Sequence, residues 1–176
     1  MYANQSNLSQ HNYFMNLALN QAKINLGNTK DNPSVGCVII KNNSLISAGS
    51  TSRSGRPHAE FNAITFSKTE VNNSTLYATL EPCSNHGKTP PCVNLIINKK
   101  IKKVIFSIFD PDIKSFKKSI LKLKKKNISF LINILNNDTK LFYRSYTKSK
   151  KKILPFVTSK LAISKDFYTI NKKKNG

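Results

Sequence analysis

Acidic residues are scarce in this chain of 176 residues, because eight Asp and Glu stand against 29 Lys and Arg, for a formal net charge of +21. Such a balance is common among nucleic-acid-binding proteins. Arginine is scarce too, since 26 of the basic residues are Lys, and arginine is the residue suited to bidentate recognition of phosphates. Lys, Asn and Ile are abundant together. We interpret the charge as a bias of the whole sequence and expect no specific nucleic-acid partner.

Long apolar runs are also missing. No stretch approaches the roughly 18 residues of a membrane span, and the polar first 30 residues contain no secretory signal. We therefore expect a cytoplasmic protein without a membrane partner. Hydrophobic residues still make up 39% of the chain, which is enough for a single core at this length. Three cysteines are an odd number for a disulfide scaffold, so paired thiols are better interpreted as metal ligands or catalytic groups.

Hydrophobic spacing predicts helices that alternate with short, β-branched strands. The expected helices cover residues 13–26, 58–67, 92–98 and 116–126, and the expected strands cover residues 35–40, 45–48, 74–80, 104–109 and 128–131. This alternation is typical of an α/β layered sheet.

Composition divides the chain into three parts. Residues 1–10 are polar and predicted to be a flexible N-terminus, and residues 11–138 are predicted to form the folded domain. Residues 139–176 are a Lys-rich C-terminal segment, in which 156–163 could form one further strand.

Chemically informative residues occur in three short motifs, His58-Ala59-Glu60, Glu81-Pro82-Cys83 and Pro90-Pro91-Cys92. One imidazole and two thiolates suit Zn²⁺, and three protein ligands leave its fourth position to water, whose pKa the metal lowers. Glu60 lies two residues after His58 and can move protons without being a ligand. This pattern is typical of zinc deaminases. We predict one Zn²⁺ per chain on His58, Cys83 and Cys92, with Glu60 as the catalytic acid and base. A structural zinc knuckle is the alternative.

The cysteine spacing departs from the usual Pro-Cys-x-x-Cys, because eight residues separate Cys83 from Cys92. The whole segment, with Ser84-Asn85-His86-Gly87-Lys88-Thr89-Pro90-Pro91 between the cysteines, resembles the deaminase domain of the bifunctional riboflavin-biosynthesis deaminase/reductase family. The resemblance runs from about His11 to Leu131. Its other matches are Asn32-Pro33-x-Val35-Gly36-Cys37-Val38-Ile39, Gly55-x-Pro57-His58-Ala59-Glu60-x-Asn62-Ala63 and Asp110-Pro111.

The resemblance implies a cytidine deaminase-like fold, a three-layer α/β/α sandwich whose five-stranded mixed sheet is flanked by helices. It implies hydrolytic deamination of 2,5-diamino-6-ribosylamino-4(3H)-pyrimidinone 5′-phosphate to 5-amino-6-(5-phosphoribosylamino)uracil and ammonia. In this comparison Asn32 would hold the pyrimidine, Lys88 and Asp110 would contact the substrate, and His86 would partly replace a histidine usual at Asn85. The resemblance also implies a homodimer or larger assembly.

Four places differ from the family pattern. Thr51 and Asn85 stand where His is usual, Asp112 stands where Asn is usual, and residues 115–119 replace a Gly-containing loop. These differences keep open the alternative of a degenerate homologue that acts as a partner protein. The high positive charge favours two further alternatives, a tRNA- or nucleotide-acting zinc deaminase and a non-catalytic RNA-binding protein on the same scaffold.

Residues 155–164 resemble the opening strand of the family's reductase domain, which needs roughly another 200 residues. The sequence therefore predicts no NADPH site and no reductase step in this chain. A separate reductase is a candidate partner.

Overall fold

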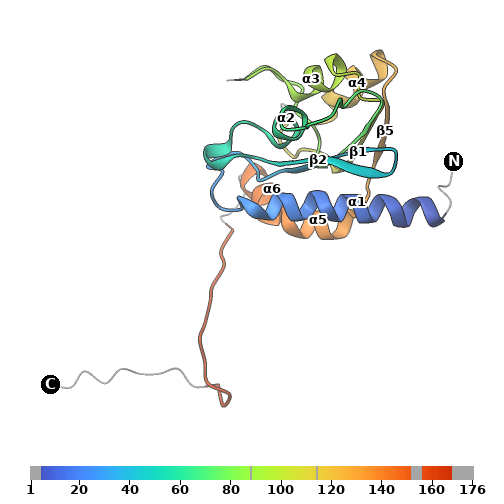
Figure 1. The fold of residues 1–176 in the computed structure, drawn as a ribbon. Helices are drawn as coiled ribbons and strands as arrows, with labels where there is room; N and C mark the ends of the chain where they lie inside the picture. Colours follow the sequence, from blue (N-terminus) through green and yellow to red (C-terminus); the bar gives the residue numbers. More distant parts are fainter. Residues whose placement is uncertain (1–4, 88, 114, 152–155, 168–176) are drawn as a thin grey trace.

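A computed structural model describes residues 5–87, 89–113, 115–151 and 156–167 (Figure 1). Its centre is one five-stranded sheet with the order β2-β1-β3-β4-β5. Strand β1 is antiparallel to β2 and β3, whereas β3, β4 and β5 are parallel to one another. The strands are β1 Gly36–Lys41, β2 Ser44–Ser50, β3 Thr75–Leu80, β4 Lys103–Ile108 and β5 Ser129–Ile132. The five-stranded mixed sheet expected from the sequence is confirmed.

Helices cover both faces of this sheet (Figure 1). The helices are α1 Gln5–Ile24, α2 Ala59–Thr65, α3 Cys92–Asn98, α4 Lys118–Lys125, α5 Asn136–Phe142 and α6 Arg144–Lys151. Helices α2, α3 and α4 contribute to one apolar cluster, and α1 contributes to a second on the opposite face, where α5 also lies. The molecule therefore has the three layers of an α/β/α sandwich.

Strand β1 shows why two apolar layers form. Cys37 and Ile39 belong to the cluster under α2 and α3, while Val38 and Ile40 belong to the cluster under α1. A strand covered on both faces is a continuous apolar run rather than an alternating one. At Gly36 an added Cβ would lie 1.8 Å from the carbonyl oxygen of Ala18. Only glycine therefore allows α1 to approach the sheet this closely.

The first helix starts earlier than the sequence indicates. Residues 5–10, which composition assigns to a flexible terminus, form the first turns of α1. Two buried side chains secure the helix just beyond this point. His11 Nδ1 lies 2.7 Å from the hydroxyl of Tyr77, and the ring of Phe14 contacts the same tyrosine.

The C-terminal side of the fold also extends further than predicted, because residues 139–151 form most of α5 and all of α6 instead of part of a tail. Tyr143 is 2% exposed and joins a buried chain of hydrogen bonds. Its hydroxyl donates to the carbonyl of Ser34 at 2.9 Å and lies 2.7 Å from Thr79 Oγ1. Thr79 Oγ1 in turn accepts the backbone N–H of Gly36. These bonds connect the α5–α6 junction to β1 and β3.

The described part of the tail differs from the expected further strand. Residues 156–164 have no regular secondary structure and are exposed. Strand formation requires a hydrogen-bonding neighbour, and the five-stranded sheet ends at β2 and β5.

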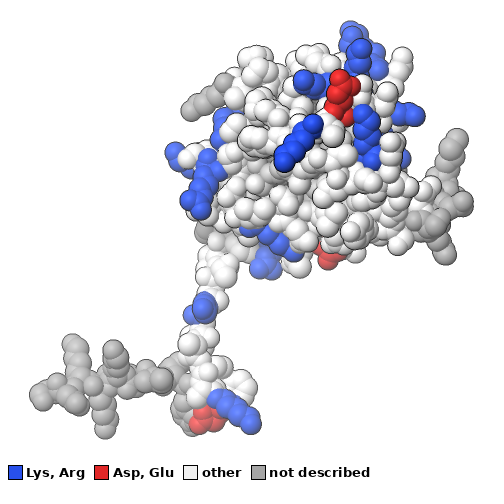
Figure 2. All heavy atoms as spheres, viewed as in Figure 1, with Lys and Arg blue, Asp and Glu red and all other residues white. Residues whose placement is uncertain are grey.

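The basic residues do not form one continuous patch on the face that Figure 2 shows, where Lys and Arg are scattered over the surface. This distribution agrees with the interpretation of the charge as a compositional background. Among the described residues, no helix has both the length and the apolar character needed to cross a membrane.

Tyr143→Phe should lower the free energy of unfolding by about 1–3 kcal/mol, because a buried carbonyl and a buried hydroxyl each lose a hydrogen-bond partner. Tyr13→Phe is the matched control, since Tyr13 is 61% exposed, and it should change stability by less than about 0.5 kcal/mol. Urea denaturation of both variants measures the difference. Equal stability of the two variants would contradict the anchoring role of Tyr143.

Candidate metal centre and active site

Three chain segments converge near the C-terminal end of β3. His58 caps the N-terminus of α2, and Cys92 is the first residue of α3. Cys83 follows β3 after a two-residue connection, Glu81-Pro82. The carboxyl ends of strands in open α/β sheets are the usual place for ligand sites. The sheet and its two helices thus bring together side chains that lie 34 residues apart in the sequence.

The three predicted ligands have the spacing of a metal site. His58 Nδ1 lies 3.5 Å from Sγ of Cys83 and 3.5 Å from Sγ of Cys92, and all three ligand atoms lie within 4.8 Å of one another. A tetrahedral Zn²⁺ with bonds of about 2.3 Å to sulfur and about 2.0 Å to nitrogen separates such atoms by about 3.5 Å. The donor set and its spacing therefore fit zinc.

The two thiols differ in acidity. The pKa of Cys83 is lowered to about 4, chiefly by the hydrogen bond with the Cys92 side chain and further by His58 and the Cys92 backbone N–H. That N–H donates to Cys83 Sγ at 3.2 Å. The same side-chain hydrogen bond, together with burial, raises the pKa of Cys92. Cys83 thus readily provides one thiolate, and Cys92 must release its proton when a metal binds.

Glu60 is buried beside the ligands, with 3% of its surface exposed. Burial raises the pKa of this carboxyl to about 7, and the negative charge of Cys83 adds to the increase. A carboxyl that titrates near neutrality can both accept and return a proton. Glu60 lines the same cavity as His58 and Cys83.

The cavity beside the ligands has a volume of about 330 Å³. Three of the four predicted substrate-binding residues, Asn32, His86 and Asp110, line it together with Glu60. The fourth, Lys88, lies outside the described residues. The structure thus gathers three segments that are distant in sequence around one space, and the individual roles of these residues stay predictions.

Hydrogen bonds hold two of these side chains in place. Asn32 Nδ2 donates to the carbonyl of Gly55 at 2.9 Å. Gly55 has a φ of +87°, and a Cβ there would lie 2.5 Å from the carbonyl oxygen of Thr29. Asp110 Oδ1 accepts the backbone N–H of Asp112 at 3.0 Å. Burial raises the pKa of Asp110.

Two of the positions that depart from the family pattern form hydrogen bonds near the site. Thr51 is buried, and its hydroxyl accepts the backbone N–H of Val35 at 2.9 Å. Asp112 contributes its backbone N–H to Asp110 and its carboxylate to an ion pair with Lys150. Glu81 holds residues 115–119, the segment that replaces the family's Gly-containing loop. Its carboxylate accepts the backbone N–H groups of Lys117 and Ser119.

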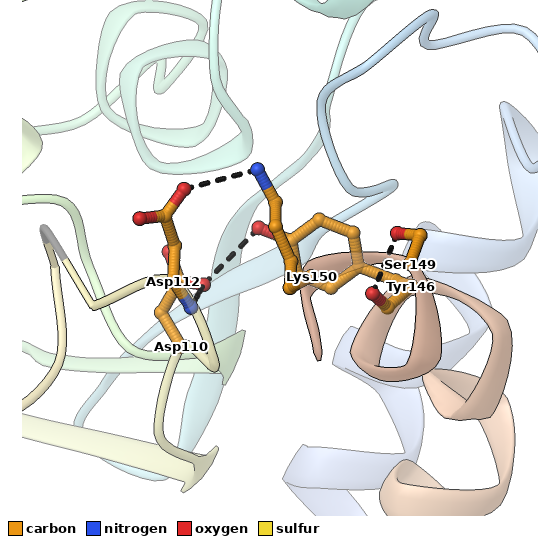
Figure 3. A network of polar contacts seen from close by, with 5 residues as sticks. All are labelled: Asp110, Asp112, Tyr146, Ser149 and Lys150. Atoms are coloured by element: carbon orange, nitrogen blue, oxygen red, sulfur yellow. Dashed lines mark hydrogen bonds and ion pairs between the residues drawn. The ribbon is translucent and has the colours of Figure 1, made fainter. Parts of the chain in front are cut away.

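Sequence reasoning missed the residues that α6 contributes. Tyr146 and Lys150 line the cavity, and Figure 3 shows them pointing toward Asp110 and Asp112. A helical pattern is present in this segment, since Thr139, Tyr143, Tyr146 and Lys150 recur at intervals of three or four residues. The many lysines around them obscured it. Arg56 also lines the cavity and was not predicted.

Cys83→Ser and Cys92→Ser should each reduce bound zinc from about one ion per chain to a small fraction, because two protein ligands hold zinc far more weakly than three. Cys37→Ala is the matched control, since Cys37 is buried in β1 and does not belong to the cluster of ligands found in the described chain. Elemental analysis after dialysis, with circular dichroism to verify folding, measures the effect. Zinc retained by the two serine variants would contradict the ligand assignment.

Comparison with known proteins agrees with this geometry. Residues 8–108, more than half of the chain, match the model of the cytidine and deoxycytidylate deaminase zinc-binding region. The diaminohydroxyphosphoribosylamino-pyrimidine deaminase of Buchnera aphidicola subsp. Schizaphis graminum is 43% identical over 117 residues, which are 66% of this chain and 80% of that protein.

Solved structures show the same relationship. RibD of Acinetobacter baumannii, form 1, superposes with a TM-score of 0.77 at 36% identity, over 81% of this chain and 40% of that one. The deaminase/reductase of Thermotoga maritima superposes with a TM-score of 0.80 at 33% identity, over 85% and 44% of the two chains. This chain therefore spans less than half the length of those two proteins. Its matches in sequence and structure show that it belongs to the zinc-binding cytidine and deoxycytidylate deaminase family, among the diaminohydroxyphosphoribosylaminopyrimidine deaminases.

Proposed function

We propose that this protein deaminates 2,5-diamino-6-ribosylamino-4(3H)-pyrimidinone 5′-phosphate to 5-amino-6-(5-phosphoribosylamino)uracil, with release of ammonia, as a step of riboflavin biosynthesis. The observation that carries the proposal is the buried carboxyl of Glu60 beside the His58, Cys83 and Cys92 cluster, at the wall of a cavity of about 330 Å³. The names of the relatives supply the substrate, because the Buchnera protein is a deaminase of this compound class and the Escherichia coli relative is a riboflavin biosynthesis protein.

His58, Cys83 and Cys92 would hold the metal, and zinc in such a site supplies a nucleophilic water at neutral pH. The reaction forms a carbon–oxygen bond at the amino-bearing ring carbon and breaks its carbon–nitrogen bond. Glu60 takes the proton that the attacking water gives up and delivers it to the departing amino group. Its pKa of about 7 suits both transfers, and its burial keeps bulk water from competing for the proton.

Three lining residues would position the substrate. The Asn32 side chain, held at Gly55, is suited to hydrogen-bond the polar edge of the pyrimidine. Asp110 is an acceptor for sugar hydroxyls or ring N–H groups, and His86 lines the same cavity from the loop between β3 and α3. Lys88 completes the predicted set through its positive charge. This division of roles agrees with a ring that binds at the metal end and a phosphorylated arm that points outward.

The size of the cavity supports a small substrate over tRNA. Pockets of roughly 300–1,000 Å³ enclose most of a small ligand, and on the one face that Figure 2 shows the described Lys and Arg residues are scattered. The homodimer or larger assembly and the separate reductase that the resemblance implies stay predictions.

Glu60→Gln should keep about one zinc per chain and lose at least about 100-fold in kcat, because the amide occupies the same space but cannot carry the proton. Glu70→Gln is the control, since Glu70 is exposed and lies outside the cavity, and it should keep wild-type activity. Ammonia release from the phosphorylated pyrimidine measures turnover, with cytidine, deoxycytidylate and tRNA assayed in parallel.

Two outcomes would contradict the proposal. Turnover by Glu60→Gln near the wild-type rate would refute the proton-transfer role. A zinc-loaded wild-type protein that releases ammonia from deoxycytidylate or tRNA, but not from the phosphorylated pyrimidine, would refute the substrate.

A further inference from the structure

We propose that Lys150, on the helix α6 that follows the predicted deaminase domain, binds the phosphate of the substrate. The inference rests on the proposed function for the identity of the phosphorylated ligand. It goes beyond that function because it assigns the phosphate site to a segment outside the family's deaminase motifs.

The geometry of α6 places Lys150 at the cavity. Tyr146 and Lys150 are one helical turn apart and both line the space that also contains His58 and Glu60. The hydroxyl of Tyr146 donates to Asp110 Oδ1 at 3.1 Å. One turn later, Lys150 Nζ lies 3.0 Å from Asp112 Oδ2 (Figure 3). Two successive contacts thus attach this face of α6 to the loop after β4.

The surroundings of Lys150 suit a phosphate. An ammonium group has three hydrogen-bond donors, and the contact with Asp112 uses one of them. The carboxylate thereby fixes the position of the ammonium while leaving donors for a second anionic group. The Lys150 side chain is about one-third exposed, at 32%. It therefore lies at the outer part of the cavity, where a solvated phosphate loses the least hydration.

A second cation, Arg56, lines the same cavity. Arg56 lies two residues before the metal ligand His58 in the sequence, and both side chains line the cavity. Its Nη1 donates a hydrogen bond to Thr89 Oγ1 at 2.5 Å. Arg56 is thus hydrogen-bonded to the segment between Cys83 and Cys92, whereas Lys150 is paired with Asp112 on the loop after β4.

The carboxylates of Asp110 and Asp112 explain why a phosphate at this part of the cavity needs the ammonium of Lys150. Asp110 and Asp112 would repel a phosphate that carries close to two negative charges. Lys150 offsets the charge of Asp112, and Tyr146 donates to Asp110. Without the ammonium, the outer end of the cavity would present two acids to an anionic substrate. The two carboxylates are instead suited to accept hydrogen bonds from the ribose hydroxyls.

Lys150→Met tests the proposal, because methionine keeps the length of the side chain and removes its charge. The substrates are the phosphorylated pyrimidine and the same compound after removal of the phosphate. We expect the variant's kcat/KM for the phosphorylated compound to fall about 10- to 100-fold, mainly through KM, because a charge-assisted hydrogen bond is lost. For the dephosphorylated compound we expect less than about a twofold change. Lys151→Met is the control, since Lys151 is exposed and does not line the cavity, and it should match the wild type on both substrates.

Binding of ribose 5-phosphate to the zinc-loaded protein, measured by isothermal titration calorimetry, separates this inference from the proposed function. We expect Lys150→Met, but not Lys151→Met, to weaken that binding at least about 10-fold. This result in a protein that does not deaminate the pyrimidine would overturn the proposed function and support the phosphate site. An equal loss on both pyrimidine substrates, or ribose 5-phosphate binding that does not depend on Lys150, would overturn the assignment of Lys150.

Discussion

The convergence of His58, Cys83 and Cys92 at the end of β3 is the constraint on which the rest of the site depends. Two helix starts and one strand end have to meet with ligand atoms 3.5 Å apart. The partly buried thiolate of Cys83 and the buried carboxyl of Glu60 lower the stability of the fold unless hydrogen bonds or a cation compensate their charge. The fold meets this cost with the contacts among His58, Cys83 and Cys92, and a bound metal would meet most of the remainder.

The same burial that makes the metal site costly gives Glu60 its chemistry. Because the Glu60 carboxyl, on the first turn of α2, is buried, its pKa rises to about 7. An exposed carboxyl would stay ionised at neutral pH and would be a poor donor to a leaving group. The packed layers of the sandwich are therefore part of the proposed catalytic mechanism, because they keep Glu60 out of water.

The sequence predicted the strands, the helices up to residue 126 apart from the start of α1, and the residues that cluster as candidate metal ligands, because these depend on local signals. Short apolar runs identify strands, and Cys83 and Cys92 stand next to prolines in a recognisable spacing. It did not predict α6 as part of the fold, because the lysines of that segment resemble a solvated tail. The packing of this segment depends on the buried Tyr143, which follows α5, and on the half-buried Tyr146 of α6. Their partners, Ser34, Thr79 and Asp110, lie far away in the sequence. Contacts of such long sequence separation become visible only when the chain has folded.

The central claim is that three side chains of this protein hold one zinc ion and leave a position for water. X-ray absorption spectroscopy at the zinc K edge of the purified protein tests this claim most directly. The account predicts two sulfur ligands at about 2.3 Å, one imidazole nitrogen at about 2.0 Å and one further light atom from solvent. A spectrum with four protein ligands, or with three or more sulfur atoms, would describe a structural zinc site and contradict the account.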